Sequence, residues 1–76
     1  MFIKARYVKN GIPTGRSYTF NGPDGTLPND KLQDPRNGSK LVATDEPVEL
    51  DWIHSYGADN LVTLVKDTED GGEANG

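Results

Sequence analysis

Apolar and polar residues alternate along the first segment of the chain, residues 2–9. The odd positions from Ile3 to Tyr7 are apolar, whereas Lys4 and Arg6 occupy the even positions between them. A period of two places one set of side chains on each face of an extended chain. We therefore expect a strand here with one apolar face and one basic face.

A return strand is expected over residues 16–20, which makes the opening segment a hairpin. Asn10 and Gly11 lie between the two strands, and both residues tolerate the positive φ that tight turns need. Pro13 has no N–H for a ladder position, so we expect a loop over residues 10–13 rather than a two-residue turn. The apolar face of the first strand then lies beside Arg16, Tyr18 and Phe20, and its basic face lies beside Ser17 and Thr19.

Short apolar runs separated by Gly, Pro and Asn predict the remaining elements. We expect an edge strand over 31–33, a strand over 40–44, and a strand over 60–66 that is central because it has few polar positions. Residues 48–56 fit either the alternation of a strand or the spacing of a helix. Acidic residues in the first turn and Gly57 as a stop favour a short helix or 3₁₀ turn.

Four or five short strands with one short helix or 3₁₀ turn predict a mostly β protein. At this size we expect a small SH3-like antiparallel β-barrel in residues 1–66. Residues 67–76 hold four acidic residues and no large apolar one. Such a segment buries too little to offset its ordering entropy, so we predict a disordered, acidic, Gly-rich tail.

The composition removes several kinds of site. The 76-residue chain has no Cys and one His, which excludes a disulfide framework and a thiolate metal site. A chain of this length hides only about 60% of its unfolded surface, so we expect modest stability. No stretch approaches the roughly 20 apolar residues of a membrane span, and the start does not resemble a signal peptide. We therefore expect a cytoplasmic protein that does not associate with membranes.

Charge is unevenly distributed along the chain, whose formal net charge is −4. Residues 1–20 contain four basic residues and no acid, whereas residues 44–76 contain nine acids and one Lys. This asymmetry predicts either a charged surface for a partner or attraction between the two ends of the chain within the fold. The candidate partner-binding residues are the basic residues of the hairpin, Lys4, Arg6, Lys9 and Arg16.

No arrangement of residues predicts catalysis, a cofactor site or a metal site. The only His, His54, shares a short segment with Asp51 and Ser55, and side chains at that spacing diverge instead of forming a triad. The acids of residues 45–51 are interpreted as the first turn of the helix and not as a catalytic pair. The Gly-rich residues 22–25 do not lead into a helix, as a phosphate-binding loop does. We expect a non-enzymatic protein without a cofactor.

Nucleic-acid binding is the alternative function for the basic hairpin. Proteins that bind single strands combine basic groups with aromatic rings, and Tyr7 and Tyr18 lie on this hairpin. The predicted faces nevertheless place both tyrosines opposite Lys4 and Arg6, which makes them core residues, and the chain is acidic, with a pI of about 4.7. The leading hypothesis is a protein-interaction module, and a nucleic-acid-binding accessory factor is the alternative.

Three local patterns resemble small β-barrel proteins encoded by phages and prophages. They are Tyr7–Gly11 with Gly15–Phe20, Asn29–Leu32, and Gly38–Thr44. The patterns are also similar to the N-terminal DNA-end-binding domain of primosomal helicases. The resemblance covers residues 2–66 and implies an SH3-like fold and an origin in a phage or other mobile element, without any catalytic residue. The chain departs from the pattern at Asn29, where a Gly is typical, and by the inserted residues 35–37.

Overall fold

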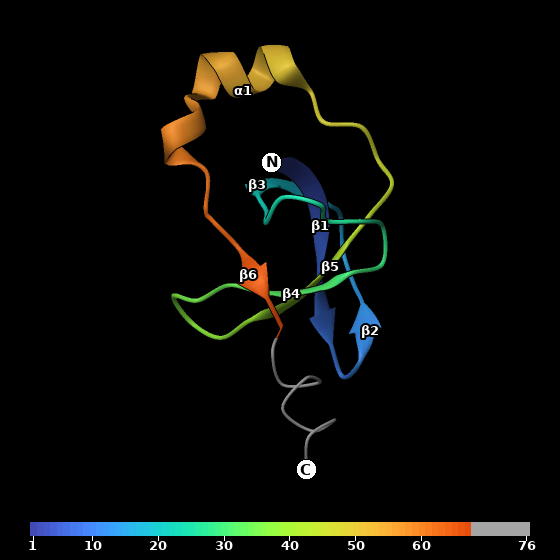
Figure 1. The fold of residues 1–76 in the computed structure, drawn as a ribbon. Helices are drawn as coiled ribbons and strands as arrows, with labels where there is room; N and C mark the ends of the chain where they lie inside the picture. Colours follow the sequence, from blue (N-terminus) through green and yellow to red (C-terminus); the bar gives the residue numbers. More distant parts are fainter. Residues whose placement is uncertain (68–76) are drawn as a thin grey trace.

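The computed structural model describes residues 1–67 and shows a mostly β chain with one short helix, as predicted (Figure 1). A six-stranded sheet accounts for most of the regular secondary structure of these residues. Its strands are β1 (Phe2–Lys9), β2 (Ile12–Pro13), β3 (Tyr18–Asn21), β4 (Lys31–Gln33), β5 (Lys40–Ala43) and β6 (Val65–Lys66). The helix α1 (Leu50–Tyr56) and the 3₁₀ helix η1 (Ala58–Asn60) lie between β5 and β6 in the sequence.

The longest strand, β1, organises the sheet. Its first half pairs with β3, its middle with β5 and its last residues with β2, always antiparallel. β4 pairs with both β5 and β6, so the strand order is β2-β1-β5-β4-β6, with β3 also beside β1. The strand predicted over 31–33 therefore exists, but it lies inside the sheet and not at its edge.

The turn between β1 and β2 is a two-residue turn at Asn10–Gly11, so the predicted loop over residues 10–13 is wrong. The two turn residues have φ of 55° and 80°, as a type I′ turn requires. Pro13 pairs with Val8, and the next residue, Thr14, donates its N–H to β1 over 2.8 Å. Pro13 thus occupies a position whose N–H would point away from β1, where a proline costs no ladder hydrogen bond.

The chain leaves the ladder between β2 and β3. Thr14 bonds to Tyr7, and Tyr18 pairs with Ala5, so three residues on this side face the single residue Arg6 on β1. Extra residues on one strand form a bulge. The predicted return strand therefore begins two residues late, and the residues of the bulge project from the sheet.

β3 keeps the predicted faces, but one of its aromatic residues is not in the core. Phe20 pairs with Ile3 and is buried. Tyr18 is 47% exposed, so its prediction as a core residue is wrong. As the first residue of β3 it has Tyr7 on one side, with 6.2 Å between ring centroids, and it remains open to solvent elsewhere.

One apolar cluster forms the main core on the face of β1 that the alternation predicted. Its buried members are Ile3, Ala5, Phe20, Leu32, Leu41, Ala43 and Leu64, with Tyr7 and Val62 packed against them. All but one of the buried members lie on strands β1, β3, β4 and β5. The cluster is small, as expected for a chain of this length.

The predicted central strand over residues 60–66 is wrong. Only Val65–Lys66 forms a strand, and it lies at the end of the strand order. Leu61 and Leu64 are both buried, whereas Val65 is 42% exposed. Buried positions three residues apart do not fit the two-residue period of a strand, so this segment packs against the core without extending the sheet.

Asn21, the last residue of β3, lies against residues 62–64, which precede β6 at the end of the strand order. The N–H of Asn21 donates to the Val62 carbonyl over 3.0 Å, and its carbonyl accepts from the N–H of Leu64 over 2.8 Å. Within residues 1–67, the only strand-type pairing here is a single parallel bridge between Asn21 and Thr63. Strand pairing therefore leaves the sheet open.

The short helix predicted within residues 48–56 is confirmed as α1. It ends at Gly57, which has φ of 100° and donates its N–H to the Ile53 carbonyl over 2.8 Å. Ile53 is the only buried residue of the helix. In Figure 1, α1 lies at the end of the sheet where β1 begins, and the β1–β2 turn lies at the opposite end.

Nine residues of the predicted tail, 68–76, lie outside the described residues. Its first residue, Asp67, is described. The N–H of Asp67 donates to the Lys31 carbonyl over 3.1 Å, and its carboxylate accepts from the Lys40 ammonium over 3.1 Å. Asp67 is thus bound to the sheet by both its backbone and its side chain.

Candidate functional site

The structure gives the four basic residues of the candidate site different surroundings. Lys4 and Arg16 line the same hollow. Arg6 makes an ion pair with Glu46 in the loop after β5. Lys9 is exposed beside the β1–β2 turn, and five residues of extended strand place it about 16 Å from Lys4. Of the four candidate residues, only Lys4 and Arg16 therefore line this hollow.

Arg6 is matched by an acid from the C-terminal half of the chain. Its guanidinium lies 3.3 Å from the Glu46 carboxylate, and the Ser17 hydroxyl donates to that carboxylate over 2.6 Å. The Ser17 hydrogen bond, followed by the contact with Arg6, holds the pKa of Glu46 below its ordinary value. Attraction between the basic and acidic halves of the chain thus operates within the fold at this position.

The hollow that contains Lys4 and Arg16 lies between the opening hairpin and α1 and has a volume of about 180 Å³. Its other lining residues are Ser17, Tyr18, Thr19, Glu49 and Trp52. The guanidinium carbon of Arg16 is 5.8 Å from the centre of the Tyr18 ring, within cation–π range. The hollow therefore combines aromatic rings with charges of both signs.

Two aromatic side chains of α1 continue this surface. Trp52 and Tyr56 are one helical turn apart, and their rings stack with centroids 4.9 Å apart and 8° between the planes. They are 46% and 49% exposed. We call the side chains of Lys4, Arg16, Tyr18, Glu49, Trp52 and Tyr56 the helix–hairpin surface. Contiguous exposed apolar groups with a polar rim are typical of interaction sites.

Sequence reasoning did not identify the aromatic part of this surface. The spacing of Trp52, Ile53 and Tyr56 indicates a helix, but it does not say which of these side chains is buried in the fold. The structure buries Ile53 and leaves the two aromatic residues half exposed. The available signal was their four-residue separation, which places them on one helix face.

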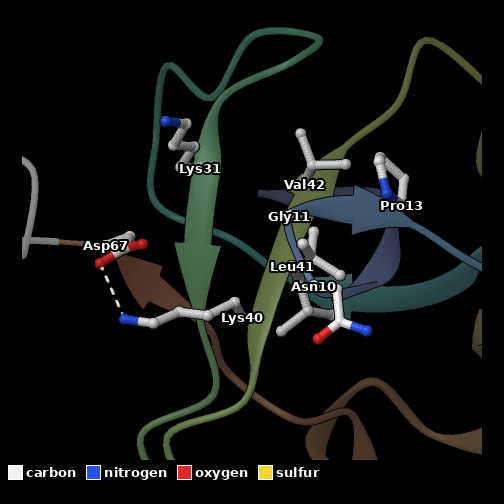
Figure 2. A pocket seen from close by; sticks show the side chains of 9 residues that line it. Asn10, Gly11, Pro13, Lys31, Lys40, Leu41, Val42 and Asp67 are labelled. Atoms are coloured by element: carbon white, nitrogen blue, oxygen red, sulfur yellow. Dashed lines mark hydrogen bonds and ion pairs between the residues drawn. The ribbon is translucent and has the colours of Figure 1, made fainter.

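A second concave region lies on the outer face of the sheet, between the β1–β2 turn and strands β4 and β5 (Figure 2). It has a volume of about 360 Å³. Pro13 and Val42 contribute apolar surface, and Lys40 and Asp67 lie on the other side. The Lys40 ammonium is 3.1 Å from the Asp67 carboxylate, whose side chain is only 9% exposed. This groove contains an internal ion pair, and we assign no ligand to it.

A buried carboxylate shapes the loop between β4 and β5. The Asp34 side chain is fully buried and accepts three hydrogen bonds from Arg36, one from the backbone N–H and two from the guanidinium, over 2.9 to 3.2 Å. These bonds hold the pKa of Asp34 below its ordinary value, with the side-chain hydrogen bonds as the main cause. The Asp34 carbonyl also accepts from the N–H of Gly38 over 2.8 Å. The arrangement gives this loop a fixed shape and assigns Asp34 a structural role.

Within the part of the chain that the structure describes, acidic and His side chains form no group of three that could hold a metal ion. His54 is exposed on α1. No helix within residues 1–67 is long and apolar enough to cross a membrane.

Comparisons of the chain with family models, curated proteins and solved structures give no match. The functional proposal consequently rests on the geometry and chemistry of the surface. Asn29 has φ of 74°. Asn tolerates this left-handed conformation better than most residues, so the backbone at this position does not require Gly.

Proposed function

We propose that this protein is a non-enzymatic protein-interaction module and that a protein partner binds its helix–hairpin surface. The observation that carries the proposal is the half-exposed, stacked pair Trp52–Tyr56 beside the charged hollow. Trp, Tyr and Arg are the side chains that most often dominate the binding energy of protein interfaces. Here Arg16 and Tyr18 stand next to the aromatic pair.

The proposal keeps two of the four basic residues that the sequence indicated. Lys4 and Arg16 line the hollow and form part of the surface. Arg6 already has Glu46 as its partner, and Lys9 lies toward the other end of β1. The aromatic residues of α1 take their place as the expected main contacts.

A nucleic-acid-binding accessory factor is the alternative, and the exposure of Tyr18 and Trp52 favours it. Bases stack on exposed aromatic rings, and basic side chains bind the phosphates. The formal net charge of the chain is −4, but residues 1–67, which carry the surface, contribute only −1 of it, with eight basic and nine acidic residues. Protein binding remains the leading proposal because the hollow also contains Glu49, which repels phosphate.

We further propose an SH3-like barrel, an origin in a phage or other mobile element, and a location in the cytoplasm. The approach of Asn21 to the Val62–Leu64 segment supports the barrel. The local patterns in residues 2–66 support the origin. These points add to the interaction proposal, which does not depend on them.

Affinity capture from the source cells tests the proposed function. The baits are the wild type, Trp52→Ala and, as a matched control, Ile12→Ala, which removes a 64% exposed side chain from β2. We expect the wild type and the control to recover the same protein and Trp52→Ala to lose it. Equal recovery by all three baits contradicts the proposal.

A titration with single- and double-stranded oligonucleotides, followed by the fluorescence of the only Trp, tests the alternative. Phosphate binding predicts an affinity that falls steeply as salt rises. Saturable, salt-sensitive binding would favour the nucleic-acid-binding function over the protein-interaction module. An unchanged fluorescence signal at low salt would exclude nucleic-acid binding.

A further inference from the structure

We propose that the partner of the helix–hairpin surface is a second copy of this chain, in a two-fold symmetric dimer. This inference rests on the proposed function, because it uses the same surface. It is carried by the charge arrangement around the aromatic centre. Lys4 and Arg16 line the hairpin side of the hollow, and Glu49 lines the helix side together with Trp52.

In a two-fold dimer the same patch is used by both copies, so the patch must complement itself. A patch of one sign repels its copy, whereas this patch has positive charge on the hairpin and negative charge on the helix. A two-fold axis through the hollow, between its hairpin side and its helix side, places the hairpin of one copy against the helix of the other. Arg16 of each copy then faces Glu49 of the other copy, so the two charge contacts are both attractive.

The same mixed charge disfavours other kinds of partner. A strongly acidic segment meets Glu49 at the edge of the hollow, and a strongly basic segment meets Lys4 and Arg16. Like charges across an interface are costly and exclude wrong partners. The surface therefore fits a partner with both signs of charge around an apolar centre, and a second copy of this chain has that arrangement.

The exposed area of the aromatic side chains sets the expected strength of the dimer. Trp52, Tyr56 and Tyr18 are 46%, 49% and 47% exposed. Side chains of this type bury roughly 200 Å² each, so about 100 Å² per ring is still open, or roughly 600 Å² in a dimer. Stable interfaces bury about 1,200 Å² or more in total. The aromatic rings alone supply about half of that area, and interfaces below about 1,200 Å² are typical of weak complexes, so we expect a weak dimer that forms as concentration rises.

Sedimentation of the full chain from about 10 μM to about 1 mM tests the inference. The mass of the wild type should rise from 8.3 kDa toward twice that value. Trp52→Ala should shift the midpoint to at least about tenfold higher concentration, because it removes a central aromatic anchor. Ile12→Ala, which removes an exposed side chain from β2 at the turn end of β1, should behave as the wild type.

Charge exchange gives the sharpest test. Arg16→Glu alone and Glu49→Lys alone each place like charges at both contacts of a homodimer, so each variant should dimerise more weakly than the wild type. An equimolar mixture of the two variants restores opposite charges at both contacts, and the mixed dimer should form with near wild-type affinity. Both side chains are exposed, so the fold should tolerate the changes, and circular dichroism verifies this.

Three results would overturn the inference: a mass of 8.3 kDa at every concentration, a dimer unaffected by Trp52→Ala, or a mixture that associates no better than its components. Its failure can be separated from failure of the proposed function. If the wild type is monomeric but captures another protein in a Trp52-dependent way, the interaction module stands and the second copy is rejected. If neither event depends on Trp52, both proposals fail.

Discussion

The buried side chain of Ile53 allows a direct test of what holds α1 in place. Ile53 is the only residue of α1 that is fully buried, and it lies outside the main core cluster. Its removal should release the helix that carries Trp52 while leaving the main cluster intact. We therefore expect Ile53→Ala to destabilise the fold far more than truncation of an exposed residue.

The size of the effect follows from burial. Ile→Ala at a buried position costs about 2–5 kcal/mol, and a site at the margin of the core can partly collapse, so we expect about 2–3 kcal/mol. A domain of this size has a free energy of unfolding of about 3–10 kcal/mol. The substitution therefore removes a large fraction of the total, and with a urea slope of about 1 kcal/mol/M the midpoint should fall by about 2–3 M.

Urea unfolding, followed in parallel by far-ultraviolet circular dichroism and by Trp52 fluorescence, measures this shift. Ile12→Ala is the matched control because it removes the same atoms from a side chain that is 64% exposed, and its midpoint should move by less than about 0.5 M. If Ile53→Ala and Ile12→Ala have the same midpoint, the burial of Ile53 is not what holds α1, and the reasoning is refuted.

Two further predictions concern the turns. Gly11→Ala should destabilise the fold by about 1 kcal/mol because Gly11 has φ of 80°. Asn10→Asp, which preserves a type I′ turn sequence, should change the urea midpoint little, and equal midpoints for the two variants contradict the turn assignment. Arg36→Gln should destabilise the fold at neutral pH, and Arg36→Lys should not restore it fully, because Asp34 loses the two-pronged guanidinium contact. The pKa of Asp34 lies below its ordinary value of 3.8, so this stabilisation is complete above that pH and disappears as pH falls through the lower folded value. The free energy of unfolding should be measured for the wild type and Arg36→Gln from about pH 7 down to about pH 2. The two values should converge only at the acid end, and a difference between them that stays constant with pH would contradict this.

The elements that the sequence predicts well are those that local pattern determines. The alternation in residues 2–9 and the helical spacing ended by Gly57 gave β1 and α1, because each signal lies within one element. The loop over 10–13 failed because the effect of Pro13 depends on the pairing register, which fixes the direction of its missing N–H. The strand over 60–66 failed because burial there comes from packing over the core and not from pairing.

The candidate site was only partly accessible to sequence reasoning for the same reason. Charge predicts Lys4 and Arg16, but the ion pair of Arg6 depends on Glu46, which is 40 residues from Arg6 in the sequence. The exposure of Trp52 depends on which face of α1 the rest of the fold covers. Such contacts are non-local, so residue type and spacing do not determine them.

Acrylamide quenching of Trp52 fluorescence tests the central claim most directly, since this is the only Trp in the chain and it lies on the proposed surface. The quenching constant is measured for the dilute protein and for the same protein bound, either to the captured partner or to itself at high concentration. The interaction proposal predicts that binding lowers the constant at least about twofold, because the half-exposed ring becomes covered. An unchanged constant in a verified complex would show that the protein binds through a different surface.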